Sequence, residues 1–94
     1  MAKNKDGMKK WIVYILRCSD KTLYTGITND LDRRLMLHQN GVASRYTRSR
    51  LPVKLQHQEQ CRSRSEALKK EYAIKQLKRI EKEAYIRNHG YKDH

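Results

Sequence analysis

Three side chains suited to handling a phosphate group lie in one short segment, LYTGITNDLDRRLMLH, residues 23–38. Tyr24 comes shortly before a glycine, whereas Arg34 and His38 follow on a stretch with leucine spacing. A guanidinium presents planar, forked donors that match phosphate oxygens. An imidazole ionises near pH ~6.5, so it can exchange a proton near neutrality. A histidine on an apolar stripe is, however, more often a hydrogen-bonded, partly buried residue than a catalyst. Two explanations are open: ordinary packing with solubilising charges, or a site that binds a phosphate.

Helical periodicity separates the two adjacent arginines of this segment. At about 100° per residue, Leu31, Leu35 and His38 share one stripe, which we expect to face the core. Arg34 borders that stripe one turn before His38, whereas Arg33 points to nearly the opposite side and is expected to be a solvated charge. Arg34 is therefore the candidate phosphate ligand. The alternative is an arginine whose stem covers apolar surface while its head reaches water.

A carboxylate interrupts the expected apolar face of a later helix. Ala67, Leu68 and Ile74 define that face in the segment SEALKKEYAIKQL, and Glu71 lies in its middle. Burying an unpaired carboxylate costs on the order of several kcal/mol, so Glu71 must be paired, protonated or bound to a metal. An ordinary ion pair with Lys75, four residues on, is one explanation. The other is a hard divalent ion such as Mg²⁺, which needs one carboxylate, water and substrate phosphate oxygens.

A basic segment, VASRYTRSRLP at residues 42–52, lacks helical periodicity and is predicted to be an exposed loop. Arginine suits phosphate contacts and tyrosine suits stacking on bases, so this loop is a candidate nucleic-acid contact; the alternative is a solvated loop. Its candidate residues are Arg45, Tyr46, Arg48 and Arg50.

The charge balance points in the same direction. The 94 residues carry 22 Lys and Arg against 10 Asp and Glu, a net charge of +12. Such an excess favours a polyanionic partner, most often nucleic acid, over a small basic protein of another kind.

Cys18 and Cys61 are too few and too far apart for a zinc cluster and are expected to be reduced thiols. The apolar run WIVYIL is too short for a membrane span and has no cleavage site beside it, so we expect a cytoplasmic protein.

Hydrophobic patterning predicts the elements that position these residues. WIVYILR and LYTGIT are rich in β-branched and aromatic residues and predict a hairpin, in which Gly26 marks a bulge or a close approach. Asn29 or Asp30 is a suitable N-cap, and Ser63 and Glu66 have the spacing of a capping box. The predicted strands cover residues 11–17, 23–28 and 53–60, and the predicted helices cover residues 31–39, 63–79 and 81–88.

The order β-β-α-β-α-α predicts a single α+β domain over residues 10–88. Residues 1–9 are expected to form a mobile basic arm, and residues 89–94 a frayed tail.

The order and spacing of VYI at residues 13–15, YTG at residues 24–26, Arg34 and Glu71 resemble the GIY-YIG nuclease superfamily. The resemblance runs from about Trp11 to Ile86. It is closest to the short stand-alone bacterial members, which are related to the excision-repair incision domain. It implies a small three-stranded antiparallel sheet flanked by three helices, and metal-dependent hydrolysis of a nucleic-acid phosphodiester.

The same resemblance implies a role for each matched residue. Tyr24 is similar to the tyrosine that activates the attacking water, and Tyr14 to its companion on the neighbouring strand. Arg34 is similar to the arginine that binds the scissile phosphate. Glu71 is similar to the sole protein ligand of the metal, Mg²⁺ or Mn²⁺. His38 lies where relatives carry a tyrosine or a histidine near the active water, and it competes with Tyr24 for the part of the base.

The sequence departs from the family pattern at several positions. The first triplet, Ile12-Val13-Tyr14, lacks its glycine, and Thr25 replaces a common isoleucine. Ile27 stands where excision-repair relatives have a lysine, and the late asparagine of those relatives has no clear counterpart.

The expected function is a metal-dependent endonuclease, acting on DNA more than RNA in repair or recombination, with a possible targeting partner. The alternatives are a nucleic-acid-binding domain with little or no catalysis, and a basic partner in a protein or ribonucleoprotein assembly.

Overall fold

A computed structural model of the chain describes residues 10–89. The expected arm at residues 1–9 lies outside the described residues, as does most of the expected tail. His89, the first residue of that tail, is the last residue of a helix instead.

The centre of the molecule is a three-stranded antiparallel sheet in the order β2-β1-β3. Its strands β1 (Trp11–Arg17) and β2 (Leu23–Thr28) confirm the predicted hairpin residue for residue. Strand β3 (Lys54–Cys61) begins one residue later than predicted. The reason is that the side chain of Gln39 binds both backbone polar groups of Val53, at 2.7 and 3.2 Å, so pairing with β1 starts after it.

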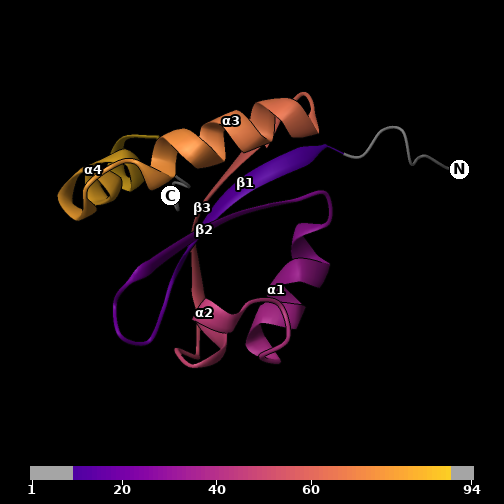
Figure 1. Cartoon of the computed structure of the whole chain (residues 1–94), viewed down its shortest axis with the longest axis vertical. Helices are drawn as coiled ribbons and strands as arrows, with labels where there is room; N and C mark the ends of the chain where they lie inside the picture. The colour runs from indigo at the N-terminus through magenta and orange to yellow at the C-terminus, as the bar shows by residue number, and fades with distance from the viewer. Residues whose placement is uncertain (1–9, 90–94) are drawn as a thin grey trace, which may run out of the picture.

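Helices cover both faces of the sheet (Figure 1). One face carries α1 (Leu31–Gln39) and α2 (Arg45–Arg48), and the other carries α3 (Arg64–Lys75) and α4 (Arg79–His89). Alternate residues of β1 serve two separate cores, because successive side chains of a strand point to opposite faces. The core under α3 and α4 contains Val13, Ile15, Cys61, Ala67 and Ile74, and the core under α1 contains Tyr14, Leu16, Cys18 and Val53.

The short helix α2 corrects the prediction of a loop across residues 42–52. Its N-cap is Ser44, whose hydroxyl accepts a hydrogen bond from the Thr47 backbone N–H at 3.2 Å. Thr47 is fully buried and bonds to His38, so a tertiary contact holds the turn in place. Four residues make about one turn, which is too short to leave a periodic pattern in the sequence.

The C-terminal helices also differ from their predicted limits. Helix α3 ends at Lys75 rather than near residue 79, and α4 begins at Arg79 because the Glu81 carboxylate accepts the Lys78 N–H at 2.7 Å. The expectation that Leu68 belongs to the core is wrong, since 38% of it is exposed. The buried stripe of α3 is narrow, and Leu68 lies about 100° around the helix from buried Ala67.

Ion pairs and hydrogen bonds fasten α3 and α4 to the sheet. The Glu59 carboxylate on β3 accepts hydrogen bonds from Lys70 on α3 at 2.8 Å and from the Tyr85 hydroxyl on α4 at 2.7 Å. Two residues before Tyr85 on α4, Glu83 forms a two-pronged ion pair with Arg17 of β1, at 2.7 and 2.9 Å. Within residues 10–89, no helix has the length and apolar character needed to cross a membrane.

Candidate active site

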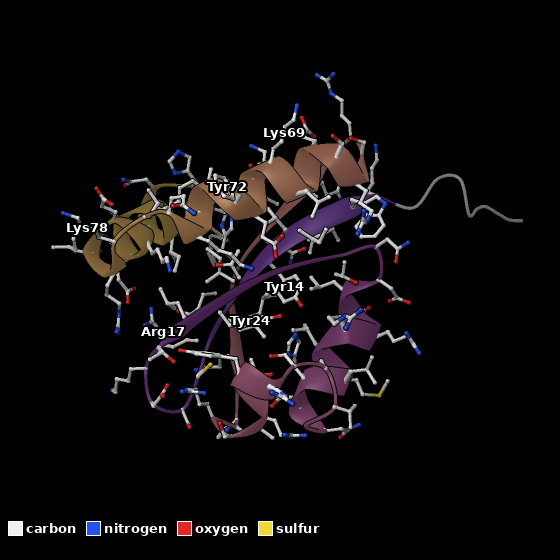
Figure 2. All side chains as sticks on the ribbon, in the orientation of Figure 1. Tyr14, Arg17, Tyr24, Lys69, Tyr72 and Lys78 are labelled. Carbon is white, nitrogen blue, oxygen red and sulfur yellow. The ribbon has the colours of Figure 1, made fainter. Side chains whose placement is uncertain are left out.

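Tyr14 and Tyr24 lie beside one another on the face of the sheet that α1 and α2 cover (Figure 2). Tyr14 pairs with Gly26, and Tyr24 pairs with Leu16, so the two rings are diagonal neighbours on adjacent strands with centroids 6.4 Å apart. A Cβ atom at Gly26 would lie 2.7 Å from the Tyr14 hydroxyl oxygen. The glycine therefore serves a close approach, and the irregularity in the sheet lies elsewhere, between Ile15 and Leu16 in the pairing with β3.

A buried chain of hydrogen bonds runs from β1 through α1 to α2. His38 Nε2 lies 2.9 Å from the Tyr14 hydroxyl, and His38 Nδ1 lies 2.9 Å from the Thr47 hydroxyl. The Thr47 hydroxyl is also 3.4 Å from the Ser44 carbonyl, an acceptor. Every donor finds an acceptor if Tyr14 donates to Nε2, Nδ1–H donates to Thr47, and Thr47 donates to the carbonyl.

The electrostatic surroundings agree with that proton arrangement. Tyr14 is 2% exposed and His38 is 1% exposed. Burial, the nearby phenol of Tyr24 and the Glu71 charge raise the pKa of Tyr14 well above its ordinary value, although Arg34 opposes them. Burial, and then the positive charge of Arg34, lower the pKa of His38. At neutral pH, Tyr14 therefore keeps its proton and His38 is an uncharged acceptor.

Arg34 and Glu71 come from helices on opposite faces of the sheet, yet both act on the same phenol. The charges of both residues shift the pKa of Tyr14, in opposite directions. Arg34 is half-buried while Arg33 is exposed, as the helical periodicity predicts. The cluster thus combines a guanidinium, a carboxylate and two phenols beside the β1–β2 pair.

Both explanations offered for Glu71 find support in its surroundings. Its side chain is 19% exposed, and its Oε2 lies 3.2 Å from the ammonium of Lys75, whose side chain is 52% exposed. Such helical pairs contribute about 0.3–0.5 kcal/mol, so a stronger cation can displace the lysine at little cost.

The donor set at Glu71 also fits a hydrated Mg²⁺ or Mn²⁺ ion. Among residues 10–89, no group of three His, Cys, Asp or Glu side chains is placed to form a cage. Mg²⁺ needs no cage, because it keeps several waters and binds through one or two carboxylates together with substrate phosphate oxygens. Glu71 already holds a cation, the Lys75 ammonium, at this carboxylate.

Tyr24 faces outward from the buried chain. Its ring lies edge-on to that of His38, with ring centroids 5.2 Å apart, and stacks on the ring of Tyr46 of α2, with centroids 6.1 Å apart. Tyr24 is partly exposed and lines a cavity of about 260 Å³. The other residues around this cavity are Leu23, Thr25, Tyr46, Lys75 and Lys82.

The basic segment is brought only in part to this cluster. Tyr46 joins it through Tyr24, and the Arg50 guanidinium lies 3.9 Å from the centre of the Tyr46 ring. Arg50 also forms an ion pair with Asp20 at 3.0 Å, and the carboxylate partly neutralises its positive charge. Arg45 and Arg48 are exposed on α2.

Sequence reasoning missed two residues at this site. Thr47 completes the buried hydrogen-bond chain, and Lys82 reaches the cavity from α4. Neither residue carries a sequence signal, because a lone threonine or lysine is common and their placement depends on tertiary packing.

Comparison with known proteins agrees with this geometry. The chain is 53% identical over 78 residues to a UPF0213 protein of Desulfotalea psychrophila, covering 82% of this chain and 71% of that protein. It is 53% identical over 72 residues to a UPF0213 protein of Halobacterium salinarum, covering 77% of this chain and 94% of that protein.

Two solved structures resemble the fold. The solution NMR structure of a UPF0213 protein from Bacillus halodurans has 41% identity and a TM-score of 0.58, covering 86% of each chain. A solution NMR structure of a protein from E. faecalis has 37% identity and a TM-score of 0.62, covering 97% of this chain and 96% of that chain.

The family description "GIY-YIG catalytic domain" matches residues 10–85, which include the whole tyrosine, arginine and glutamate cluster. The chain therefore belongs to the GIY-YIG family of nuclease domains.

Proposed function

We propose that this protein is a metal-dependent endonuclease that hydrolyses phosphodiester bonds in nucleic acid, with DNA in a repair or recombination setting as its substrate. The observation that carries the proposal is that Arg34 and Glu71, from opposite faces of the sheet, both lie close enough to Tyr14 to act on its phenol, and the Tyr24 ring lies 6.4 Å from that of Tyr14. An anion bound beside Arg34 would lie next to the carboxylate that binds the metal and next to a partly exposed phenol.

Arg34 has the role of holding the scissile phosphate. Hydrolysis adds negative charge to a group that is already anionic, so a fixed guanidinium stabilises the transition state more than the ground state. The half-buried position of Arg34 limits its conformational freedom and strengthens its field relative to an exposed arginine.

Tyr24 is the better candidate for the general base, and His38 is better suited to positioning. Both ring nitrogens of His38 are already hydrogen-bonded, and the ring is 1% exposed, so attacking water has no access to it. Tyr24 is partly exposed and lines the neighbouring cavity. His38 fixes the Tyr14 phenol through a hydrogen bond, and its ring also lies edge-on to that of Tyr24, with centroids 5.2 Å apart.

Glu71 would hold the divalent ion, with water and phosphate oxygens as the remaining ligands. When bound, such an ion supplies Lewis-acid stabilisation of the anionic transition state and lowers the pKa of a coordinated water. The Lys75 ammonium would leave the carboxylate on this exchange.

A nucleic-acid-binding domain with little or no catalysis is the second candidate. It is favoured by Ile27, which packs against the core under α3 and offers no donor where excision-repair relatives have a lysine. The net charge of +12 fits either function.

A cleavage experiment separates the two candidates. Linear, nicked, branched and single-stranded DNA, and RNA, are incubated with the full chain and Mg²⁺ or Mn²⁺. We expect metal-dependent cutting that Glu71→Gln reduces at least about 10²-fold, because the ion loses its protein ligand. Asp32→Asn, which removes an exposed carboxylate on α1, is the matched control and should cut normally. Salt-sensitive binding without cutting of any substrate would select the binding domain.

A further inference from the structure

The cavity beside Tyr24 has two lysines on one side. It is bounded by β2 through Leu23 and Thr25, by Tyr46 of α2, and by α3 and α4, and its volume is about 260 Å³. Lys75 borders it from α3 and Lys82 from α4, so basic side chains of two separate helices line one hollow. The role proposed for Tyr24 in hydrolysis leaves these two charges unexplained.

Lys82 is available to an external anion. Within residues 10–89 its ammonium forms no ion pair, although two glutamates lie next to it in the sequence. Glu81 is occupied by the backbone N–H of Lys78, and Glu83 by its ion pairs with Arg17 and with a second arginine on α4. The side chain is partly buried, so the ammonium is less free to move than that of a fully exposed lysine.

Lys75 is shared between the cavity and the metal-binding carboxylate. Its ammonium lies 3.2 Å from Glu71 Oε2, and the same side chain lines the cavity. A divalent cation at Glu71 would compete with this ammonium for the carboxylate, and the displaced lysine would turn to the cavity that it already borders. Cation binding at Glu71 and anion binding in the cavity are thereby linked.

The size of the cavity limits its occupant. Pockets for drug-sized ligands measure about 300–1,000 Å³, so a hollow of about 260 Å³ has the size of one phosphate with part of its sugar. Two ammonium groups match the oxygens of a single phosphodiester, to which each donates charge-assisted hydrogen bonds.

We infer that Lys75 and Lys82 form a second phosphate site, which binds the backbone phosphate next to the scissile one and so sets where the strand lies relative to Tyr24. This inference rests on the proposed function for its choice of substrate. It adds a site on α3 and α4 that is separate from Arg34. A free phosphate or a mononucleotide offers the same oxygens, so the experiment must distinguish these from a polynucleotide.

The test measures binding and does not depend on cutting. The full chain is titrated into fluorescein-labelled duplex DNA in EDTA, and anisotropy gives Kd at several salt concentrations. We expect Lys82→Gln to weaken binding about fivefold or more and to reduce the slope of log K against log[salt] by about 0.9, the value for one lost phosphate contact. The matched control is Lys69→Gln, which removes the same charge from the outer face of α3, away from the two tyrosines (Figure 2).

The inference is overturned if Lys82→Gln and Lys69→Gln weaken binding equally, since the loss would then reflect net charge alone. It is also overturned if inorganic phosphate or dTMP at millimolar concentration displaces wild-type and Lys82→Gln protein from DNA equally well. If no substrate is cut but Lys82→Gln still loses affinity selectively, the nuclease proposal fails while the phosphate site stands.

Lys75 gives a second readout, on the metal itself. In titrations with Mn²⁺ followed by electron paramagnetic resonance, Lys75→Gln should bind Mn²⁺ at least about twofold more tightly than wild type, because the competing ammonium is gone. Lys69→Gln should bind Mn²⁺ like wild type. Unchanged Mn²⁺ affinity in Lys75→Gln would contradict the link between the carboxylate and the cavity.

Discussion

At the scale of single residues, the adjacent arginines of α1 test whether helix geometry separates a functional charge from a solubilising one. Arg34 is half-buried and acts on the Tyr14 phenol, whereas Arg33 is exposed. We expect Arg34→Ala to lower kcat/KM for DNA cleavage at least about 10²-fold, because transition-state charge loses its partner. Arg33→Ala should stay within about twofold. Equal losses in the two variants would contradict the assignment.

The pH dependence of cleavage distinguishes the two candidate bases. If a tyrosine accepts the proton from water, the single-turnover rate should rise between pH 6 and 9, because a phenol ordinarily ionises near pH ~10. If His38 were the base, its lowered pKa would make the rate level off below neutrality. We expect the rise, and we expect Tyr24→Phe to abolish it. A plateau at neutral pH would move the role to His38.

The residues of the cluster differ in how far the sequence predicts them. Tyr14, Tyr24, Arg34 and Glu71 are recognisable because their types, order and spacing carry the family resemblance. Their convergence depends on packing across both faces of the sheet, which spacing alone does not determine. Lys82 could not be predicted, because nothing in the sequence shows that α4 turns it towards β2.

At the scale of elements, the start of α3 fixes where Glu71 and Lys75 lie. The Ser63 hydroxyl accepts the Glu66 N–H at 3.1 Å, and the Glu66 carboxylate accepts the Arg62 N–H at 2.6 Å. We expect Ser63→Ala to lower the free energy of unfolding by about 1 kcal/mol, because the cap is lost. Urea denaturation measures this, with exposed Ser65→Ala inside α3 as the control. A loss in Ser65→Ala as large as in Ser63→Ala would refute the capping role.

The elements also show why some limits are predictable and others are not. Strands β1 and β2 match their predictions because dense β-branched and aromatic residues end at clear turn residues. The short helix α2 and the break between α3 and α4 depend on single side chains, Thr47 against His38 and Glu81 against the Lys78 backbone. Such contacts leave no periodic signal, so the sequence analysis missed α2 and placed the end of α3 about four residues too late.

At the scale of the whole molecule, Glu59 joins the sheet to both C-terminal helices and makes stability depend on acid. Burial alone raises the pKa of Glu59, but hydrogen bonds from Lys70, Tyr85 and His57 outweigh it and hold the pKa at about 2. A carboxyl with a depressed pKa stabilises the folded state above its unfolded pKa and loses that contribution as the pH falls. The free energy of unfolding should therefore decrease between about pH 5 and pH 2.

The variant Glu59→Gln tests that source of acid sensitivity. We expect it to be roughly 2 kcal/mol less stable than wild type at pH 7 and to show a flatter decline below pH 5, because one titrating group has been removed. Chemical denaturation at pH 7, 5, 4 and 3 gives both quantities. An unchanged slope in the variant would mean that another carboxyl, with Glu83 the first candidate, dominates the acid transition.

The division of the site between two layers has a practical consequence for anyone who purifies this domain. Neither layer holds all of the proposed catalytic and metal-binding groups: Tyr14, Tyr24 and Arg34 belong to the α1 side, and Glu71 belongs to α3. A preparation with a native far-ultraviolet circular dichroism spectrum can still be inactive if α3 and α4 are not fully packed on the sheet. Near-ultraviolet circular dichroism reports on Tyr85 and Trp11, which pack against the core under α3 and α4. It is the appropriate check of tertiary structure before any lack of activity is interpreted.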